Sequence, residues 1–157
     1  MFDLAYHSIE AAKRSGATYA DIRIIDDESE SINVKNAMPA ISRDNSSGFG
    51  VRVIADGAWG FAASPRLTKD EIEKTTKLAV EIAKASATIK KDAIKLAHEA
   101  TYKDKWNSTY IIDPFKVSLE EKLELLLGID EILRKDKRIV VANSELSFWR
   151  EIGRAHV

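Results

Sequence analysis

Residues 48–64 read GFGVRVIADGAWGFAAS. β-forming residues flank Asp56-Gly57 on both sides, and this dipeptide favours a type I′ turn, whose two central residues take positive φ. The stretch therefore predicts a tight β-hairpin that turns at Asp56-Gly57. Its other glycines, at positions 48, 50 and 60, are not required by the turn and indicate bends or close backbone approach inside the strands.

A helix and two strands are predicted before the hairpin. Residues 2–15 place apolar side chains at helical spacing, and Gly16 follows as a residue that favours helix termination. Apolar and polar residues then alternate in 17–25 and again in 30–36, which is the period of a strand with one exposed face. These segments predict an antiparallel sheet that the hairpin continues.

The segments between these predicted strands carry weaker signals of secondary structure. The acidic run at 26–30 is interpreted as a solvated strand end or turn rather than a metal cluster. Pro39 has no N–H for a central strand, so residues 37–47 are predicted to form an edge strand or the start of a loop. A turn is expected at 45–48, where Asn, Ser and Gly cluster. With the hairpin, the sheet has about five strands.

Capping boxes predict two helices in the second half of the chain. Thr68 and Glu71 begin a helix that is expected to end near residue 87. Ser118 and Glu121 begin another, which carries a strong stripe of leucines.

The remaining segments complete the predicted fold. Residues 88–105 are expected to form a loop with one short strand at 93–97, and residues 138–142 a further strand. The fold class is therefore α+β: a helix, a roughly five-stranded and mainly antiparallel sheet with a Gly-rich hairpin, and then a packing helix. The start of a second, truncated α+β domain follows.

Three stretches make up the predicted domain organisation. Residues 1–105 form an N-terminal α+β domain, and residues 106–151 begin a middle domain that is incomplete, because one apolar helix and one strand cannot bury themselves. Residues 152–157, IGRAHV, match what one reading frame of a common sequencing adapter encodes, and they are interpreted as read-through. We therefore expect the natural protein to be longer.

Composition narrows the classes of function. The formal net charge is −1, which gives no support for a nucleic-acid or membrane partner. The chain has no cysteine, which fits a reducing compartment and predicts a cytoplasmic protein. The N-terminus lacks the features of a signal peptide, and no apolar run reaches the length of a membrane span.

No metal site is predicted from the three histidines. His98-Glu99 begins like a zinc-protease helix, but Tyr102 and Lys103 occupy the positions where a second histidine would be needed. His7 lies in an amphipathic helix and is interpreted as a surface or boundary residue. His156 falls in the suspected read-through and is not counted as a ligand.

Catalytic groups of other kinds are also not predicted. The GxG at 48–50 lacks the third glycine and the helix that a phosphate loop requires. Serines 46, 47 and 64 have no histidine partner in evidence. The carboxylates of Asp21, Asp26, Asp27 and Glu30 are interpreted as solvated, because the sequence cannot place two of them across a substrate.

An ordered set of blocks resembles the TldD/PmbA family of metalloproteases, formerly named modulators of DNA gyrase. Residues 17–23 and 31–36 resemble the family's first two strands, and residues 48–53 with 56–62 resemble its most recognisable block. Asp113-Pro114 and residues 117–122 resemble the start of the middle domain and favour the TldD-like branch. The resemblance covers residues 2–151.

The resemblance implies zinc-dependent cleavage of peptides and unfolded proteins by a dimer that encloses a cavity. The dimer is either a homodimer or a TldD-like chain with a PmbA-like partner. The family's metal motif is an HExxxH helix plus a cysteine in the C-terminal part of the full protein. We therefore expect zinc to be bound outside this chain, no catalytic or metal residue within it, and no activity of this chain alone. No substrate-binding residue is assigned.

Three functions remain open at this stage. The first is the N-terminal non-catalytic part of a metallopeptidase, which helps to form the substrate cavity and the dimer. The second is a fragment of a PmbA-like partner subunit that acts by assembly alone. The third is a gyrase-interacting module.

Overall fold

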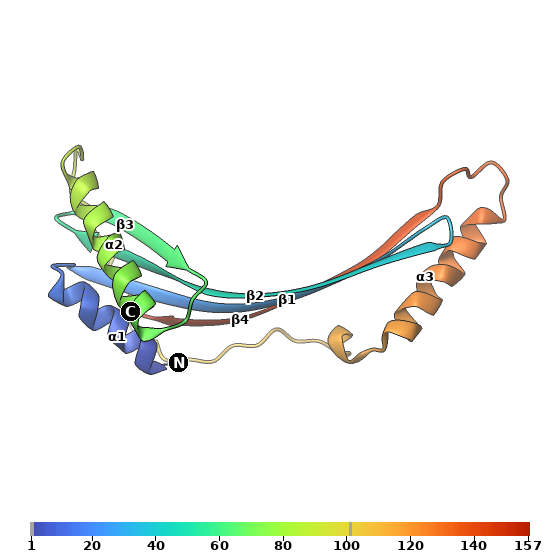
Figure 1. Cartoon of the computed structure of the whole chain (residues 1–157), viewed down its shortest axis with the longest axis horizontal. Coiled ribbons are helices and arrows are strands. Elements are labelled where there is room, and N and C mark those ends of the chain that lie inside the picture. The colour runs from blue at the N-terminus through green and yellow to red at the C-terminus, as the bar shows by residue number, and fades with distance from the viewer. Residues whose placement is uncertain (1, 101) are drawn as a thin grey trace. The chain divides into compact units, whose positions relative to one another are not determined.

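The computed structural model describes residues 2–100 and 102–157 (Figure 1). The described elements, in chain order, are α1 (Phe2–Arg14), β1 (Tyr19–Lys35), β2 (Met38–Ala55), β3 (Ala58–Ser64), α2 (Lys69–Ala87), the 3₁₀ turn η1 (Pro114–Lys116), α3 (Leu119–Arg134) and β4 (Asn143–His156). The predicted helices are confirmed, and each of the two predicted N-caps is present. Thr68 Oγ1 accepts a hydrogen bond from the N–H of Glu71, and Ser118 Oγ accepts one from the N–H of Glu121.

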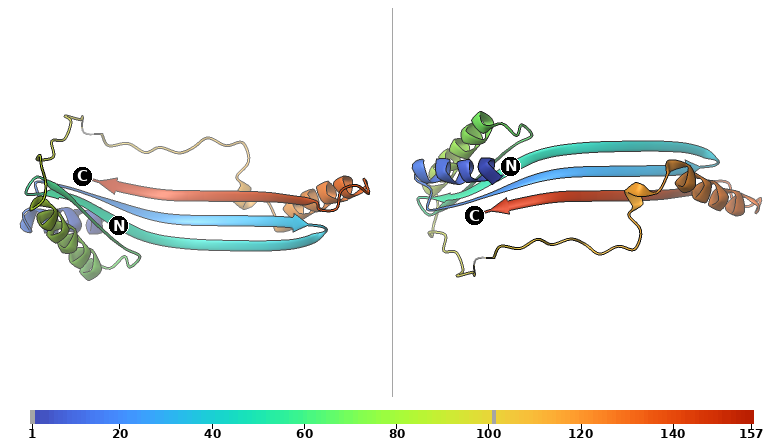
Figure 2. Two further views of the ribbon diagram at one scale, coloured as in Figure 1. Left: turned by 90° about the horizontal axis from the view of Figure 1, so that it is seen from above. Right: turned by 90° about the horizontal axis from the view of Figure 1, so that it is seen from below.

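The fold is α+β with an antiparallel sheet, as predicted, but the described sheet has four strands in the order β3-β2-β1-β4 (Figure 2). The hairpin is confirmed: β2 pairs antiparallel with β3 from Ala55↔Ala58 to Phe49↔Ser64. Asp56 and Gly57 both have positive φ, 50° and 73°, as a type I′ turn requires.

The difference in strand number has a physical cause in the acidic run. Residues 26–30 do not form a turn, because β1 continues through them to Lys35. Glu30, for example, is buried in the strand and is accommodated by ion pairs with Arg43 and Lys122. The two strands predicted at 17–25 and 30–36 are therefore one strand.

The turn predicted at 45–48 is also wrong, since β2 is extended from Met38 to Ala55. The chain turns earlier, at Asn36 and Ala37, which both have positive φ, 51° and 64°. Alanine rarely adopts this conformation, so composition gave little signal for a turn at this place. Pro39 lies near the start of β2, a position that tolerates the missing N–H.

The described residues form two compact units. Unit 1 comprises residues 2–27, 46–100 and 151–157, and unit 2 comprises residues 28–45 and 102–150. Both units are built from separate stretches of chain, because β1, β2 and β4 each contribute residues to both. The predicted domain bounds at 105 and 151 stay a prediction.

In unit 1, α1 and α2 cover one face of the sheet. Alternate residues of the strands point to this face and are buried, among them Ile22, Ile24, Val51 and Val53, as the period of a strand requires. The packing of α2 on β3 explains why position 60 is one of the additional glycines. A Cβ at Gly60 would lie 2.0 Å from the Ala79 carbonyl oxygen of α2, so only glycine permits this close packing of helix on strand.

In unit 2, the leucine stripe of α3 packs on β1. Leu126 is buried against Ile32 and Val34, with Leu119, Leu123 and Leu146 partly buried around them. Lys122 of the same helix forms a buried ion pair with Glu30. This charged pair fixes the position of α3 in addition to the apolar contact.

Two short strands predicted in the second half are wrong. No strand lies at 93–97; instead, the N–H of Ile94 donates to the carbonyl oxygen of Gly57. The last strand begins at Asn143 rather than at 138, because Asp136 holds the backbone N–H and the guanidinium of Arg138 in a local turn. β4 continues to His156 and so includes most of the IGRAHV tail, whose origin stays a prediction.

Candidate functional site

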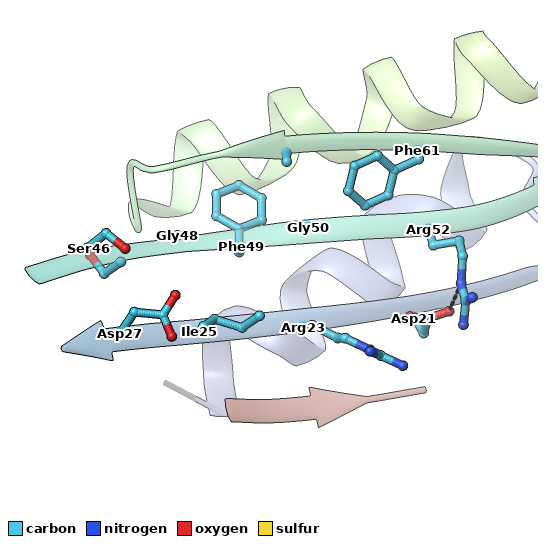
Figure 3. Close-up of a pocket in the computed structure, with 12 residues that line it drawn as sticks. Asp21, Arg23, Ile25, Asp27, Ser46, Gly48, Phe49, Gly50, Arg52 and Phe61 are labelled. Carbon is cyan, nitrogen blue, oxygen red and sulfur yellow. Dashed lines mark hydrogen bonds and ion pairs between the residues drawn. The ribbon is translucent and has the colours of Figure 1, made fainter. Parts of the chain in front are cut away.

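A shallow cleft of about 500 Å³ lies on the face of the unit 1 sheet opposite α1 and α2 (Figure 3). Three strands contribute to it. The lining residues are Asp21, Arg23, Ile25 and Asp27 of β1, Ser46, Ser47, Gly48, Phe49, Gly50 and Arg52 of β2, and Phe61 and Ala63 of β3. We call this surface the helix-free cleft.

Strand alternation brings these side chains together. Asp21, Arg23, Ile25 and Asp27 are the residues of β1 that alternate with the buried Ile22 and Ile24, so they point away from the helices. Arg52 of β2 and Phe61 of β3 lie on the same face and are Cα partners across the ladder. The pattern that buries one face of the sheet therefore also builds the cleft.

Glycine makes room for an aromatic ring in the cleft. A Cβ at Gly50 would lie 2.9 Å from Cε2 of Phe61, so the ring lies across the strand at Gly50 (Figure 3). Phe61 nevertheless remains 60% exposed. Gly50 thus gives the cleft an exposed aromatic surface, and Ile25 and Ala63 add further apolar lining.

One end of the cleft holds a paired set of polar and aromatic groups. Arg52 Nε donates to Asp21 Oδ2 at 2.8 Å, and the guanidinium carbon lies 5.1 Å from the centre of the Trp59 ring. The hydrogen bond to Asp21 raises the pKa of Arg52, and burial only partly opposes this rise. Burial, followed by the hydrogen bond and charge of Asp21, raises the pKa of the Tyr19 hydroxyl above its usual 10.0.

Two charged groups of the cleft are not paired. Among the described residues, the side chain of Arg23 makes no hydrogen bond or ion pair, and it is exposed. Asp27 Oδ1 is buried and has no hydrogen-bond partner in the part of the chain that the structure describes. Buried carboxylate oxygens are normally satisfied, so Asp27 provides an acceptor for a donor supplied by a ligand or partner.

The structure separates the carboxylates considered from sequence. Asp21 and Asp27 lie in the helix-free cleft, whereas Asp26 forms an ion pair with Arg154 at 3.4 Å and Glu30 belongs to unit 2. The interpretation of these groups as solvated is wrong for Asp21 and Glu30, which are buried and ion-paired. Sequence reasoning missed Arg23, Arg52 and Phe61, although the alternation of the strands contains the signal that joins them.

The serines considered from sequence have different surroundings. Ser46 and Ser47 line the cleft, and among the described residues neither is hydrogen-bonded to a histidine. Ser64 lies on the helix side and donates through Oγ to Glu71 at 2.8 Å. Glu71 therefore does not complete the capping box by reaching back to Thr68, because its carboxylate binds Ser64 and Arg66.

The three histidines considered from sequence have different surroundings. His7 Nε2 lies 3.1 Å from Glu73 Oε2, the ring of His156 packs edge-on against Tyr6, and His98 is exposed in the loop after α2. Within residues 2–100 and 102–157, no three His, Cys, Asp or Glu side chains are grouped to hold a metal ion. Among the same residues, no helix combines the length and apolar character needed to span a membrane.

Comparison with known proteins identifies similar sequences. Residues 20–83 match a family described as PmbA/TldA metallopeptidase domain 1. The chain is 34% identical over 120 residues to Metalloprotease MJ0996 of Methanocaldococcus jannaschii, which covers 76% of this chain and 27% of that protein. It is also 33% identical over 67 residues to the zinc metalloprotease TldD homolog of Saccharolobus solfataricus, which covers 43% of this chain and 15% of the relative. The chain thus spans about a quarter or less of these relatives.

Solved structures share the fold. A Bacteroides thetaiotaomicron protein whose name links it to modulation of DNA gyrase aligns with a TM-score of 0.80 at 19% identity, covering 99% of this chain and 36% of that one. TldE from Thermococcus kodakarensis aligns with a TM-score of 0.62 at 18% identity, covering 97% of this chain and 34% of that one. At these identities the likeness concerns the arrangement of helices and strands.

Proposed function

Because the chain belongs to the TldD/PmbA family, we propose that it is the N-terminal, non-catalytic part of a zinc-dependent metallopeptidase that acts on peptides and unfolded proteins. One observation carries the proposal. The family's domain 1 matches residues 20–83, which include the hairpin and every lining residue of the helix-free cleft.

The proposed role of this part is to form one wall of the substrate cavity. The helix-free cleft supports this role because it combines an exposed aromatic ring, apolar lining and charged groups on a rigid sheet, as binding surfaces for peptides do. No step of peptide hydrolysis is assigned to a residue of this chain, and zinc is proposed to be bound by residues outside it.

Assembly is the second part of the proposed role. α3 leaves several large apolar side chains exposed, namely Leu125, Ile129, Ile132 and Leu133. A contiguous apolar face of this kind is typical of contact with further polypeptide. We propose that it contacts the remaining domains or a second subunit, either an identical chain or a PmbA-like partner. A cytoplasmic location is part of the proposal, because the absence of cysteine fits a reducing compartment.

The complete reading frame of the gene tests this proposal. We expect it to continue beyond the present chain and to encode an HExxxH motif and a later cysteine, because two histidines and a thiolate provide three zinc ligands. A complete frame that lacks both would contradict the peptidase and favour the alternative, in which the protein is a non-catalytic PmbA-like subunit that acts by assembly.

A further inference from the structure

We infer that the helix-free cleft binds short peptides by their two free ends, with the α-amino group at Asp27 and the α-carboxylate at Arg23. This inference rests on the proposed function for the class of ligand, and it deepens that function by naming which part of a peptide the cleft recognises. Its evidence is the arrangement of charge in the cleft.

Two of the four charged groups in the cleft are available to a ligand. The cleft contains two guanidinium groups and two carboxylates, but Asp21 and Arg52 neutralise each other at 2.8 Å. The pair that remains is Arg23 and Asp27. A ligand that complements this remaining pair must carry a positive donor and a negative acceptor at separate positions.

The separation between Arg23 and Asp27 sets the length of the ligand. Arg23 and Asp27 are four residues apart on the same face of β1, and a strand rises by roughly 3.3 Å per residue, so their Cα atoms are separated by about 13 Å. Figure 3 shows Ile25 between them, with Asp27 beside Ser46 and Arg23 toward the Asp21–Arg52 pair. An extended chain of about four residues spans this length between its termini.

The cleft also has an apolar surface that the middle of a ligand can cover. Ile25 lies between the two charged residues on β1, and the Phe61 ring of β3 lies across Gly50 toward the Arg23 end of the cleft (Figure 3). Apolar side chains of a bound peptide would cover this surface and remove it from water. A ligand that matches this cleft therefore has two charged ends and an apolar centre. A short peptide with free termini has these features, whereas an internal segment of a protein has no charged ends.

Arg23 and Asp27 are expected to contribute unequally to the affinity for a peptide. A guanidinium binds a carboxylate through two parallel N–H donors, and a buried carboxylate oxygen gains most from a charged N–H donor. Arg23 is exposed, so its contribution is that of an exposed ion pair, about 1 kcal/mol or less, which corresponds to at most about fivefold in affinity. The Asp27 side chain is half-buried and its Oδ1 has no partner among the described residues, so the amino end is expected to contribute the larger factor once the side chain turns Oδ1 into the cleft.

The test uses the full chain and the tetrapeptide Ala-Phe-Leu-Ala, measured by chemical-shift perturbation and isothermal titration calorimetry. Four forms of this probe are compared: with free ends, N-acetylated, C-amidated and doubly capped. We expect the free form to bind and to shift the amide signals of residues 23–27 and 48–52. Acetylation should weaken binding about tenfold, and amidation about two- to fivefold.

Variants assign each end of the peptide to its residue. In Asp27→Asn, acetylation of the probe should no longer weaken binding, whereas amidation still does. In Arg23→Gln the reverse should hold. Asp92→Asn and Arg14→Gln change exposed residues outside the cleft and serve as matched controls, which should discriminate between the probes as the unaltered chain does. Circular dichroism confirms that each variant is folded.

Three results would overturn the inference: no binding of the free probe at millimolar concentration, equal binding of the free and doubly capped probes, or signal shifts confined to residues outside the cleft. The probes test the unaltered chain, so a variant that fails to fold leaves the comparison decisive. An unfavourable result here is separate from the proposed function, because the reading-frame test does not depend on this cleft.

Discussion

Arg52 on β2 donates through Nε to Oδ2 of Asp21 on β1 at 2.8 Å, and the Asp21 side chain is only 8% exposed. The pair links two neighbouring strands on the helix-free face and places a compensated charge at one end of the cleft. Without the guanidinium, the carboxylate would stay buried with fewer hydrogen bonds. The contact therefore contributes to stability and leaves Arg23 as the available cation of the cleft.

Arg52→Met tests this pair. We expect the free energy of unfolding, measured by urea denaturation at pH 7, to fall by about 1–3 kcal/mol, because a buried carboxylate loses its charged donor. Arg14→Met is the matched control, since Arg14 is exposed at the end of α1, and it should change stability by less than about 0.5 kcal/mol. Equal effects of the two variants would show that the Asp21 contact carries no stability.

Packing of α2 on β3 gives a second prediction. Gly60→Ala should lower the free energy of unfolding by about 1–3 kcal/mol, because the added Cβ would lie 2.0 Å from Ala79 O and 2.6 Å from Ala83 N. The opposite result is expected for Gly128→Ala in α3, where nothing lies within 4 Å of the added Cβ. There the higher helix propensity of alanine should stabilise the chain by about 0.5–1 kcal/mol. If Gly60→Ala were also stabilising, the close approach of α2 to β3 would be wrong.

Much of the fold follows from local sequence signals. Asp56-Gly57 located the hairpin and its turn, while Thr68 and Ser118 located the starts of α2 and α3. These signals are short-range, because a turn or an N-cap is satisfied by residues only a few positions away. The α+β class followed from them directly.

The long strands could not be predicted in the same way. Residues 26–30 and 45–48 look like turns by composition, yet they are extended in β1 and β2. Their conformation depends on partners distant in sequence, such as Lys122 for Glu30, which lies 92 residues away. Alternation predicts which residues of one strand share a face, but which residues of β1, β2 and β3 meet in the cleft depends on the register of the three strands, for which there is no local signal.

Acid should weaken unit 2 through Glu30. Burial would raise the pKa of this carboxyl, but the hydrogen bonds and charges of Lys122 and Arg43 outweigh burial and hold the pKa below its ordinary value of 4.5. A lowered pKa in the folded state means that the stabilising contribution is complete above about pH 4.5 and is lost as the pH falls through the lower, folded value. We expect the hydrogen-exchange protection factors of the α3 amides, which correct for the intrinsic pH dependence of exchange, to fall over this acid range.

Glu30→Gln tests that assignment. The variant should be less stable than the unaltered chain at pH 7, because Lys122 is buried and loses its counter-ion. It should also lose less stability between pH 5 and pH 3 than the unaltered chain, because position 30 no longer takes up a proton. An unchanged acid dependence in Glu30→Gln would assign the effect to other carboxylates. Glu124→Gln, at an exposed carboxylate of α3 whose side chain has no hydrogen bond or ion pair among the described residues, is the control.

The N-cap of α3 allows a prediction about a single hydrogen bond. Ser118→Ala removes the oxygen that accepts from the Glu121 N–H at 3.1 Å, and it should lower the free energy of unfolding by about 1 kcal/mol. Ser118→Asp keeps an acceptor and adds negative charge at the helix N-terminus, so it should retain stability. Thermal and urea unfolding of the two variants, compared in parallel, measure the difference; equal losses would show that the cap is not formed in solution.

The proposed role of this chain as a non-catalytic part of a zinc peptidase can be tested directly. The direct measurement is zinc content and hydrolysis of a fluorogenic peptide, made in parallel on this chain and on the protein from the complete reading frame. We predict about one zinc per chain and chelator-sensitive hydrolysis for the complete protein, with neither for residues 1–157 alone. Zinc binding and chelator-sensitive hydrolysis by residues 1–157 alone would contradict the account, as would a complete protein that binds no zinc.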